Sequence, residues 1–172
     1  MKLGRYWKMG SVLAVALILA LVVGDGPIRR GPRQQGFQVL TTATNVTLLA
    51  LDDAFPEKTN SEMLYEYPVL GSTVLVDGEA KQAAGAIQDA VVGWNGVVYM
   101  CFDPHHALRI IADGHRYEFI VCFSCNGMNV YKDGIHETNV GVTGTAVTLN
   151  SLLTAHKVPL SSFYTTKAEG EK

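Results

Sequence analysis

The sequence predicts an α+β domain, an antiparallel β-meander with one or two packed helices, preceded by an N-terminal hydrophobic segment. Four short apolar runs follow one another with turn-forming residues between them, at 97–102, 107–111, 117–123 and 128–131. This pattern is typical of consecutive antiparallel strands. The run 78–94 instead repeats its apolar residues at helical spacing and ends at glycine and Asn-Gly, which predicts a helix. Helices that pack on an antiparallel sheet define the α+β class.

The first 36 residues predict a targeting segment and a linker. Residues 1–8 form a basic region, and residues 9–24 carry no charge. The apolar run is long for a signal-peptide core and short of the roughly 20 residues of a comfortable membrane span. A cleaved signal peptide and an uncleaved membrane anchor therefore both stay open. Residues 25–36, rich in Gly, Pro and Arg, predict a flexible basic linker.

Residues 37–164 are expected to form a single α+β domain. The run 37–52 is rich in β-branched residues and predicts the first strand. The run "YPVLGSTVLV" predicts an extended piece in which Pro68 lies at an edge or a strand start. A short helix is expected to begin near Thr148 and to pack its leucines on the sheet. Residues 165–172 are polar and predict a disordered tail.

The charge distribution argues against nucleic acid as a partner. Six of the fourteen Lys and Arg residues precede Gln34, whereas fifteen of the sixteen acidic residues follow it. The body of the chain therefore has eight basic against fifteen acidic residues, a net charge of −7. Such a domain lacks the basic surface that phosphate binding requires. The protein or small-molecule partner is left open.

A two-residue turn at Asp113-Gly114 sets the register of one hairpin. This dipeptide is favoured in type I′ turns, which would place Ala112 opposite His115. Arg109 then lies opposite Glu118, and the two form a cross-strand ion pair. Because side chains alternate along a strand, the other face of the hairpin is the core side. Its expected core residues are Leu108, Ile110, Tyr117, Phe119 and Val121.

The same register places His105 opposite Cys122, and the strand order brings further reactive residues to this sheet edge. The strand predicted at 97–102 and the strand ending near Phe123 both reach the end of the sheet where the next strand begins. All three cysteines of the chain and two histidines should therefore gather there: Cys101, His105, His106, Cys122 and Cys125.

The run Cys101-Phe-Asp-Pro-His-His-Ala-Leu-Arg, followed by Tyr117-Glu-Phe-Ile-Val-Cys-Phe-Ser-Cys, resembles a family of uncharacterised exported bacterial proteins. That family carries the pattern CF-x-P-x-H-x-x-R … ICF-x-C, in which His106 fits the histidine position and His105 is the additional one. The likeness covers roughly residues 45 to 160. It implies the fold and export to the bacterial cell envelope, membrane-anchored through residues 9–24 or periplasmic or extracellular. It implies no catalytic residue.

Four hypotheses account for the cluster. One is a Cys3His zinc site, in which Cys101, Cys122 and Cys125 join one histidine at spacings that zinc sites use. A structural disulfide from Cys101 to Cys122 or to Cys125 is the second, because exported proteins oxidise their thiols. A redox-active Cys122–Cys125 pair is the third, although no helix follows to lower the thiol pKa. The fourth is nucleophilic catalysis by Cys122 with His105 as base.

We therefore expect an exported or membrane-anchored domain whose Cys/His cluster is mainly structural and whose role is binding or interaction at the cell envelope. The alternative is a metal-dependent or thiol-dependent enzyme that uses the same edge. Metal content and a count of free thiols under denaturing conditions separate the zinc hypothesis from the disulfide hypothesis.

Overall fold

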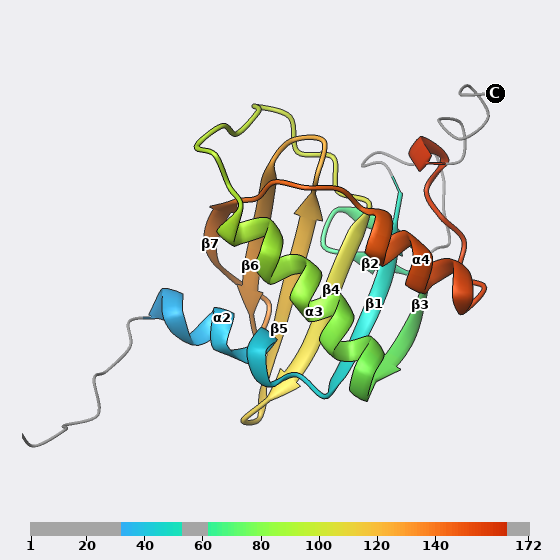
Figure 1. Cartoon of the computed structure of the whole chain (residues 1–172), viewed down its shortest axis with the longest axis horizontal. Helices are drawn as coiled ribbons and strands as arrows, with labels where there is room; N and C mark the ends of the chain where they lie inside the picture. Colours follow the sequence, from blue (N-terminus) through green and yellow to red (C-terminus); the bar gives the residue numbers. More distant parts are fainter. Residues whose placement is uncertain (1–31, 53–61, 165–172) are drawn as a thin grey trace, which may run out of the picture. The chain divides into compact units, whose positions relative to one another are not determined.

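The computed structural model describes residues 32–52 and 62–164, which form a seven-stranded antiparallel sheet with helices packed on it (Figure 1). The predicted signal or anchor at 9–24 and the predicted tail at 165–172 lie outside these residues. Within the described ranges no helix is long and apolar enough to cross a membrane. The α+β class predicted from the sequence is confirmed.

The strand order in the sheet is β2-β3-β1-β4-β5-β6-β7, so the last four strands form a meander. Every neighbouring pair is antiparallel. The strands are β1 (Asn45–Leu51), β2 (Met63–Leu64), β3 (Tyr67–Val76), β4 (His106–Ala112), β5 (His115–Cys122), β6 (Gly127–Lys132) and β7 (Ile135–Gly141).

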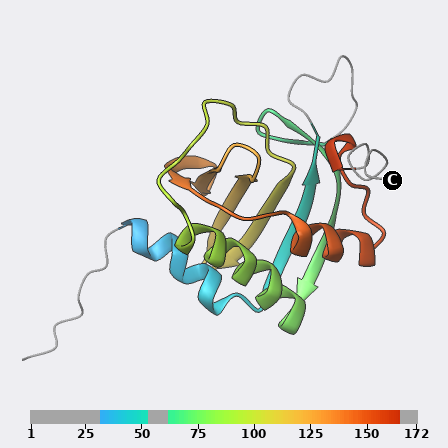
Figure 2. The ribbon, with the colours of Figure 1, turned by 45° about the horizontal axis from the view of Figure 1, so that its top comes forward.

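Three helices cover one face of the sheet: α2 (Pro32–Thr42), α3 (Asp77–Val92) and α4 (Val147–Ala155). Helix α3 runs diagonally across the sheet, and both α2 and α4 pack against it (Figures 1 and 2). The expected helix at 78–94 is α3, and the expected C-terminal helix is α4. Helix α3 buries its alanines and Ile87, which lie on one side of the helix because they repeat every three to four residues.

The core lies between this helical layer and the sheet. Its largest members include Leu48, Leu75, Leu108, Phe119 and Leu153, all fully buried. A smaller apolar cluster lies on the opposite face of the sheet. It consists of Leu49, Leu51, Leu64, Tyr67, Ala107 and Ile120, with Val69, Phe102 and Tyr131 packed against it. The sheet is therefore covered in part on both faces.

The β4–β5 hairpin has the register that the Asp113-Gly114 turn predicts. Ala112 pairs with His115, and Arg109 pairs with Glu118. The turn residues have φ values of 52° and 75°, as a type I′ turn requires at both central positions. The five residues expected on the core side of the hairpin all belong to the main core.

One predicted strand is absent: residues 97–102 form no strand but part of an irregular loop between α3 and β4. The β-branched residues of this run favour a strand, but both edges of β4 are already occupied. Strand β1 pairs with one edge and β5 with the other. The fourth strand of the meander is β7, which the sequence analysis missed because its residues are mostly polar and exposed.

The N-terminal part of the domain also differs from the prediction. The run 37–52 was expected to be one strand, but its first six residues belong to α2 and only 45–51 form β1. Helix α2 begins at Pro32, so the predicted linker at 25–36 overlaps its first turn. Val39 and Leu40 are buried against the core, and the Gln88 amide of α3 donates a 2.9 Å hydrogen bond to the Thr41 hydroxyl. Packing on α3 therefore outweighs the local strand propensity.

Replacing Gly114 by alanine should lower the free energy of unfolding by about 1 kcal/mol, because Gly114 has a φ of 75° that an L-residue adopts at a cost. No neighbouring atom would contact the added Cβ. As a matched control, Gly85→Ala in α3 also meets no neighbour. It should raise stability by about 0.5–1 kcal/mol because alanine is the better helix former. Urea unfolding measures both changes, and equal signs would contradict the turn assignment.

Candidate functional site

The three cysteine sulfurs lie together at the end of the sheet where β5 turns into β6. Cys122 is the last residue of β5, and Cys125 lies in the tight turn before β6. These two form a disulfide, with their Cα atoms 5.3 Å apart. The Cys101 Sγ lies 2.8 Å from the Cys125 Sγ. The gathering of the three sulfurs that strand order predicts is therefore present, although residue 101 comes from a loop and not from a strand.

The loop that carries Cys101 is held against this turn by its backbone and by two aromatic rings. The Tyr99 N–H donates a 2.9 Å hydrogen bond to the Cys125 carbonyl. The ring of Phe102 packs on Gly127, about 3.5 Å from the position that a Cβ would take there. The ring of Trp94 packs on Gly141 so closely that a Cβ on this residue would overlap the ring.

Gly127 and Gly141 are cross-strand partners in β6 and β7. Together they leave a flat surface on which the loop lies. A glycine inside a strand marks such a close approach, and this signal could have placed the loop from the sequence.

Polar groups surround the sulfur of Cys122. The Cys125 backbone N–H donates a hydrogen bond to the Cys122 Sγ at 3.1 Å. The Ser124 hydroxyl lies 3.3 Å from the same sulfur and 3.8 Å from the Cys125 Sγ. An N–H and a hydroxyl directed at a sulfur stabilise its thiolate form. Ser124 was not among the residues predicted from the sequence, although its position inside the C-x-x-C motif is a usable signal.

Solvent reaches the three sulfurs unequally. Cys122 and Cys125 are each 1% exposed, whereas Cys101 is an exposed free cysteine. A reactant in solution can therefore contact Cys101, whereas the other two sulfurs are shielded from solvent.

His105 lies next to the loop but among aromatic rings. It is 3% exposed, and its ring stacks on Phe163 at 4.8 Å between centroids. Its Nε2 lies 3.5 Å from an Asp103 carboxylate oxygen. The predicted pairing with Cys122 is not formed, because β4 begins at His106 and the ladder ends at the pair His106–Val121.

His106 lies on the helix-covered face of the sheet, opposite Val121 of the main core. Its Nε2 is 2.7 Å from the Asn150 side-chain oxygen on α4, and its ring lies 5.3 Å from that of Tyr164. Burial lowers the pKa of His106 to about 4, and the charge of His105 acts in the same direction. Burial raises the pKa of the Tyr164 phenol to about 12. Both groups are therefore neutral near pH 7.

The five residues proposed as metal ligands are thus divided between two places. The three sulfurs are together, while the imidazoles have the aromatic and amide neighbours just described. Among residues 32–52 and 62–164, no group of three or more His, Cys, Asp or Glu side chains is arranged to hold a metal ion. The zinc hypothesis stays a prediction.

The Arg109–Glu118 ion pair lies on the face opposite the helices. The Arg109 Nε donates a 2.8 Å hydrogen bond to one Glu118 oxygen, and the Tyr65 hydroxyl donates a 2.6 Å hydrogen bond to the other. The Arg116 Nε lies 3.5 Å from that second oxygen. Because the Glu118 carboxylate is buried, each of these partners offsets part of its desolvation cost. We therefore interpret this arrangement as structural, because both Glu118 oxygens have partners within the domain.

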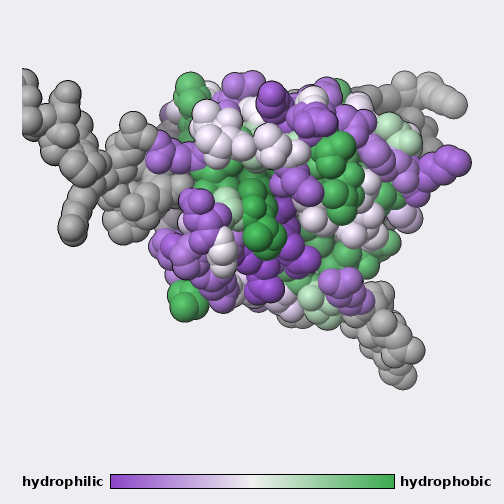
Figure 3. All heavy atoms as spheres, turned by 90° about the horizontal axis from the view of Figure 1, so that it is seen from below, coloured by the Kyte–Doolittle hydropathy of each residue, from purple (hydrophilic) through white to green (hydrophobic). Residues whose placement is uncertain are grey.

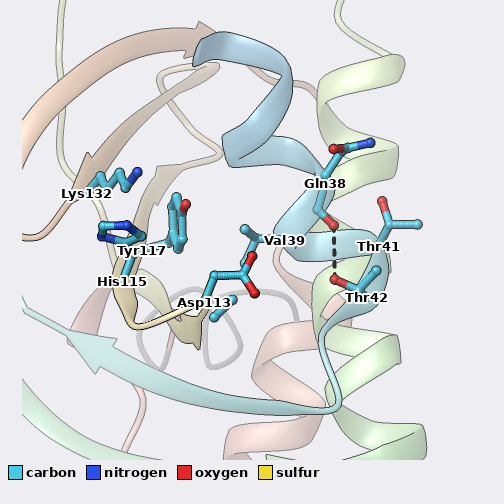
Figure 4. A pocket seen from close by; sticks show the side chains of 9 residues that line it. Gln38, Val39, Thr41, Thr42, Asp113, His115, Tyr117 and Lys132 are labelled. Carbon is cyan, nitrogen blue, oxygen red and sulfur yellow. Dashed lines mark hydrogen bonds between the residues drawn. The ribbon is translucent and has the colours of Figure 1, made fainter. Parts of the chain in front are cut away.

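A hollow of about 640 Å³ lies at the other end of the sheet, between α2 and the β4–β5 turn (Figure 4). Seen from this end, the surface carries apolar patches separated by hydrophilic side chains (Figure 3). The His115 Nδ1 is 2.6 Å from an Asp133 carboxylate oxygen, and the Lys132 ammonium lies over the Tyr117 ring at 5.5 Å. The basic groups of this hollow are therefore already paired, and we assign it no chemistry.

No protein-family model, no curated protein and no solved structure matches this chain. The resemblance to the exported bacterial family stays a prediction, and the function must be inferred from the site itself.

The buried His106 predicts how stability depends on pH. Its pKa is about 4 in the folded state against 6.5 for an unperturbed imidazole, so the unfolded chain binds the proton first as the pH falls. The stability contributed by neutral His106 is complete above about pH 6.5 and is lost as the pH falls toward 4. The loss is on the order of 3 kcal/mol.

Urea unfolding between pH 7.5 and 4 measures this loss. The double variant His106→Leu/Asn150→Leu, which removes both hydrogen-bonding groups, should have a flatter pH dependence. The variant His136→Gln is the control, because His136 is exposed and should leave the dependence as in the wild type. Equal pH dependence of the wild type and the double variant would contradict the burial of a neutral imidazole.

Proposed function

We propose that the chain is a thiol–disulfide exchange protein in which a disulfide moves along three sulfurs, those of Cys101, Cys125 and Cys122. The observation that carries the proposal is the 2.8 Å separation of the Cys101 and Cys125 sulfurs beside the Cys122–Cys125 disulfide. Exchange requires a thiolate to attack one sulfur of a disulfide. The Cys101 sulfur is already in contact with the sulfur that it would attack.

The first step is internal and needs no other reactant. The Cys101 thiolate attacks the Cys125 Sγ, so that a Cys101–Cys125 bond forms and the Cys122–Cys125 bond breaks. The electron pair of the broken bond leaves on Cys122 as a thiolate. The Cys125 N–H and the Ser124 hydroxyl are placed to stabilise that thiolate. A stabilised leaving thiolate speeds exchange.

The second stage oxidises a partner that carries two thiols. One partner thiolate attacks the Cys101 Sγ, forming a mixed disulfide and releasing Cys125 as a thiolate. The second partner thiolate then attacks the partner sulfur of that mixed disulfide and releases Cys101. The partner gains one disulfide, the protein ends with three thiols, and two protons pass from the partner to Cys122 and Cys125. The reverse sequence reduces a partner disulfide.

Burial fixes the order of the three sulfurs. Cys101 is exposed and meets the partner, whereas Cys122 and Cys125 are buried and exchange only through Cys101. This order keeps the internal disulfide from reacting with thiols that cannot dock at Cys101. Among the alternatives predicted from the sequence, this is the thiol-dependent enzyme that uses the cysteine cluster. The predicted location at the cell envelope supports it, because disulfides persist in oxidising compartments.

Single serine variants of the full chain test the internal step. Cys122→Ser should form a Cys101–Cys125 disulfide, because their sulfurs are already in contact. Cys101→Ser should keep the Cys122–Cys125 disulfide. Cys125→Ser is the control, since it removes the sulfur that both bonds share and should show no disulfide. Acid quenching, alkylation and peptide mapping by mass spectrometry identify the bonded pairs.

The wild type should have one thiol that can be alkylated under denaturing conditions, found on Cys101 or on Cys122. Three alkylated thiols together with one bound zinc ion would overturn the proposal in favour of the zinc site. Failure of Cys122→Ser to form the Cys101–Cys125 bond would overturn the relay even if the thiol count were one.

A further inference from the structure

The loop between α3 and Cys101 exposes a concentration of large apolar side chains. Fourteen large apolar residues are exposed in the described part of the chain, and six of them lie within residues 92–100. We call residues 92–100, the last residue of α3 and the loop that follows it, the apolar loop. Its exposed members are Val92, Trp94, Val97, Val98, Tyr99 and Met100.

The apolar loop lies beyond the end of the sheet and leads directly into the exposed thiol (Figures 1 and 2). Tyr99 is 56% exposed and Met100 is completely exposed, and Cys101 is the next residue. A reactant whose sulfur comes within bonding distance of the Cys101 Sγ must therefore cover part of this loop. Soluble proteins rarely expose such concentrations of apolar side chains except at interaction sites.

The charges around the loop restrict which reactant fits. No charged residue occurs from 90 to 102, and the two flanking charges are acidic. Asp89 is exposed and Asp103 is partly exposed. Carboxylates repel small anionic thiols and anionic lipid headgroups. The apolar side chains contribute binding free energy only when they are covered by apolar surface. An uncharged apolar polypeptide segment satisfies both conditions.

From this we infer that the apolar loop is a docking surface for extended, apolar, cysteine-containing polypeptide segments, the exchange partners of Cys101. The inference rests on the proposed exchange function and names its substrate class. Segments of this kind are exposed in chains that have not finished folding, because apolar residues become buried only in the native state. The site would thus favour cysteines of unfolded polypeptide over cysteines on folded, polar surfaces.

Two uncharged peptides of equal length test the docking surface. Each contains one cysteine, supplied as its mixed disulfide with mercaptoethanol, and the flanking residues are Val, Leu and Phe in one and Ser and Asn in the other. The full chain is first reduced, so that Cys125 can attack a mixed disulfide on Cys101. The rate constant of each peptide with this reduced chain is divided by that of hydroxyethyl disulfide. The wild type should react about tenfold faster with the apolar peptide, as expected for burying two large apolar side chains only in part.

Tyr99→Ser/Met100→Ser should reduce this preference to near one. The backbone hydrogen bond that positions the loop is kept, because Tyr99 makes it through its main-chain N–H. The matched control is Ile111→Ser/Ile135→Ser, which removes two exposed apolar side chains from β4 and β7, 66% and 70% exposed, and should keep the preference. A wild-type ratio near one, or an unchanged ratio in the loop variant, would overturn the inference.

Two further readouts separate the remaining outcomes. The first readout is binding to phosphatidylcholine vesicles. If the wild type and the control variant bind and the loop variant does not, the loop contacts a membrane surface, and the inference of a polypeptide partner is overturned. Failure of the exchange function itself gives a different result. The peptide preference at Cys101 would persist, but the disulfide would not pass to Cys125.

Discussion

The register of the β4–β5 hairpin is the constraint on which the rest of the structure depends. The Asp113-Gly114 turn fixes which residues pair, and strand alternation then assigns every side chain of both strands to a face. One face supplies Leu108 and Phe119 to the core beneath the helices. The other face holds the buried Glu118 with its arginines. The same register brings Cys122 to the end of the sheet where the apolar loop arrives, so a shift of one residue would disrupt the core and the sulfur cluster together.

Local signals were sufficient to predict the parts of the fold that depend on neighbours in sequence. The hairpin turn, α3 and α4 are of this kind, because turn chemistry and helical spacing are contained in a few consecutive residues. The errors at 37–42 and 97–102 have a different origin. Both runs are rich in β-branched residues. Residues 37–42 nevertheless belong to α2, because this helix packs on α3. A strand at 97–102 would need the edge of β4 that β1 occupies. Such competition between distant segments is not encoded in either run.

In the candidate site too, one part could be predicted from the sequence and another could not. The meeting of the three sulfurs follows from the order of the segments, which the sequence allowed us to predict. The place of the histidines follows from strand parity. His106 pairs with Val121 and shares its core face, whereas Cys122 is the next residue and points to the other face. His105 precedes the first pair of the β4–β5 ladder, and its carbonyl accepts a 3.0 Å hydrogen bond from the Leu51 N–H of β1. A pattern of Cys and His residues therefore predicts which residues lie near the same end of the sheet. It does not predict the direction in which each side chain points.

A redox-active C-x-x-C is weakly predicted at the sequence level because no helix follows the motif. In the usual arrangement the N-terminus of a helix stabilises the thiolate with its unpaired N–H groups. Here a tight β-turn offers a smaller version of the same interaction, since the Cys125 N–H and the Ser124 hydroxyl are both directed at the Cys122 sulfur. Cys101 then adds an exposed attacking sulfur that a two-cysteine motif lacks. Because the two strands hold the turn and paired glycines hold the loop, the sheet brings all three sulfurs together without a helix.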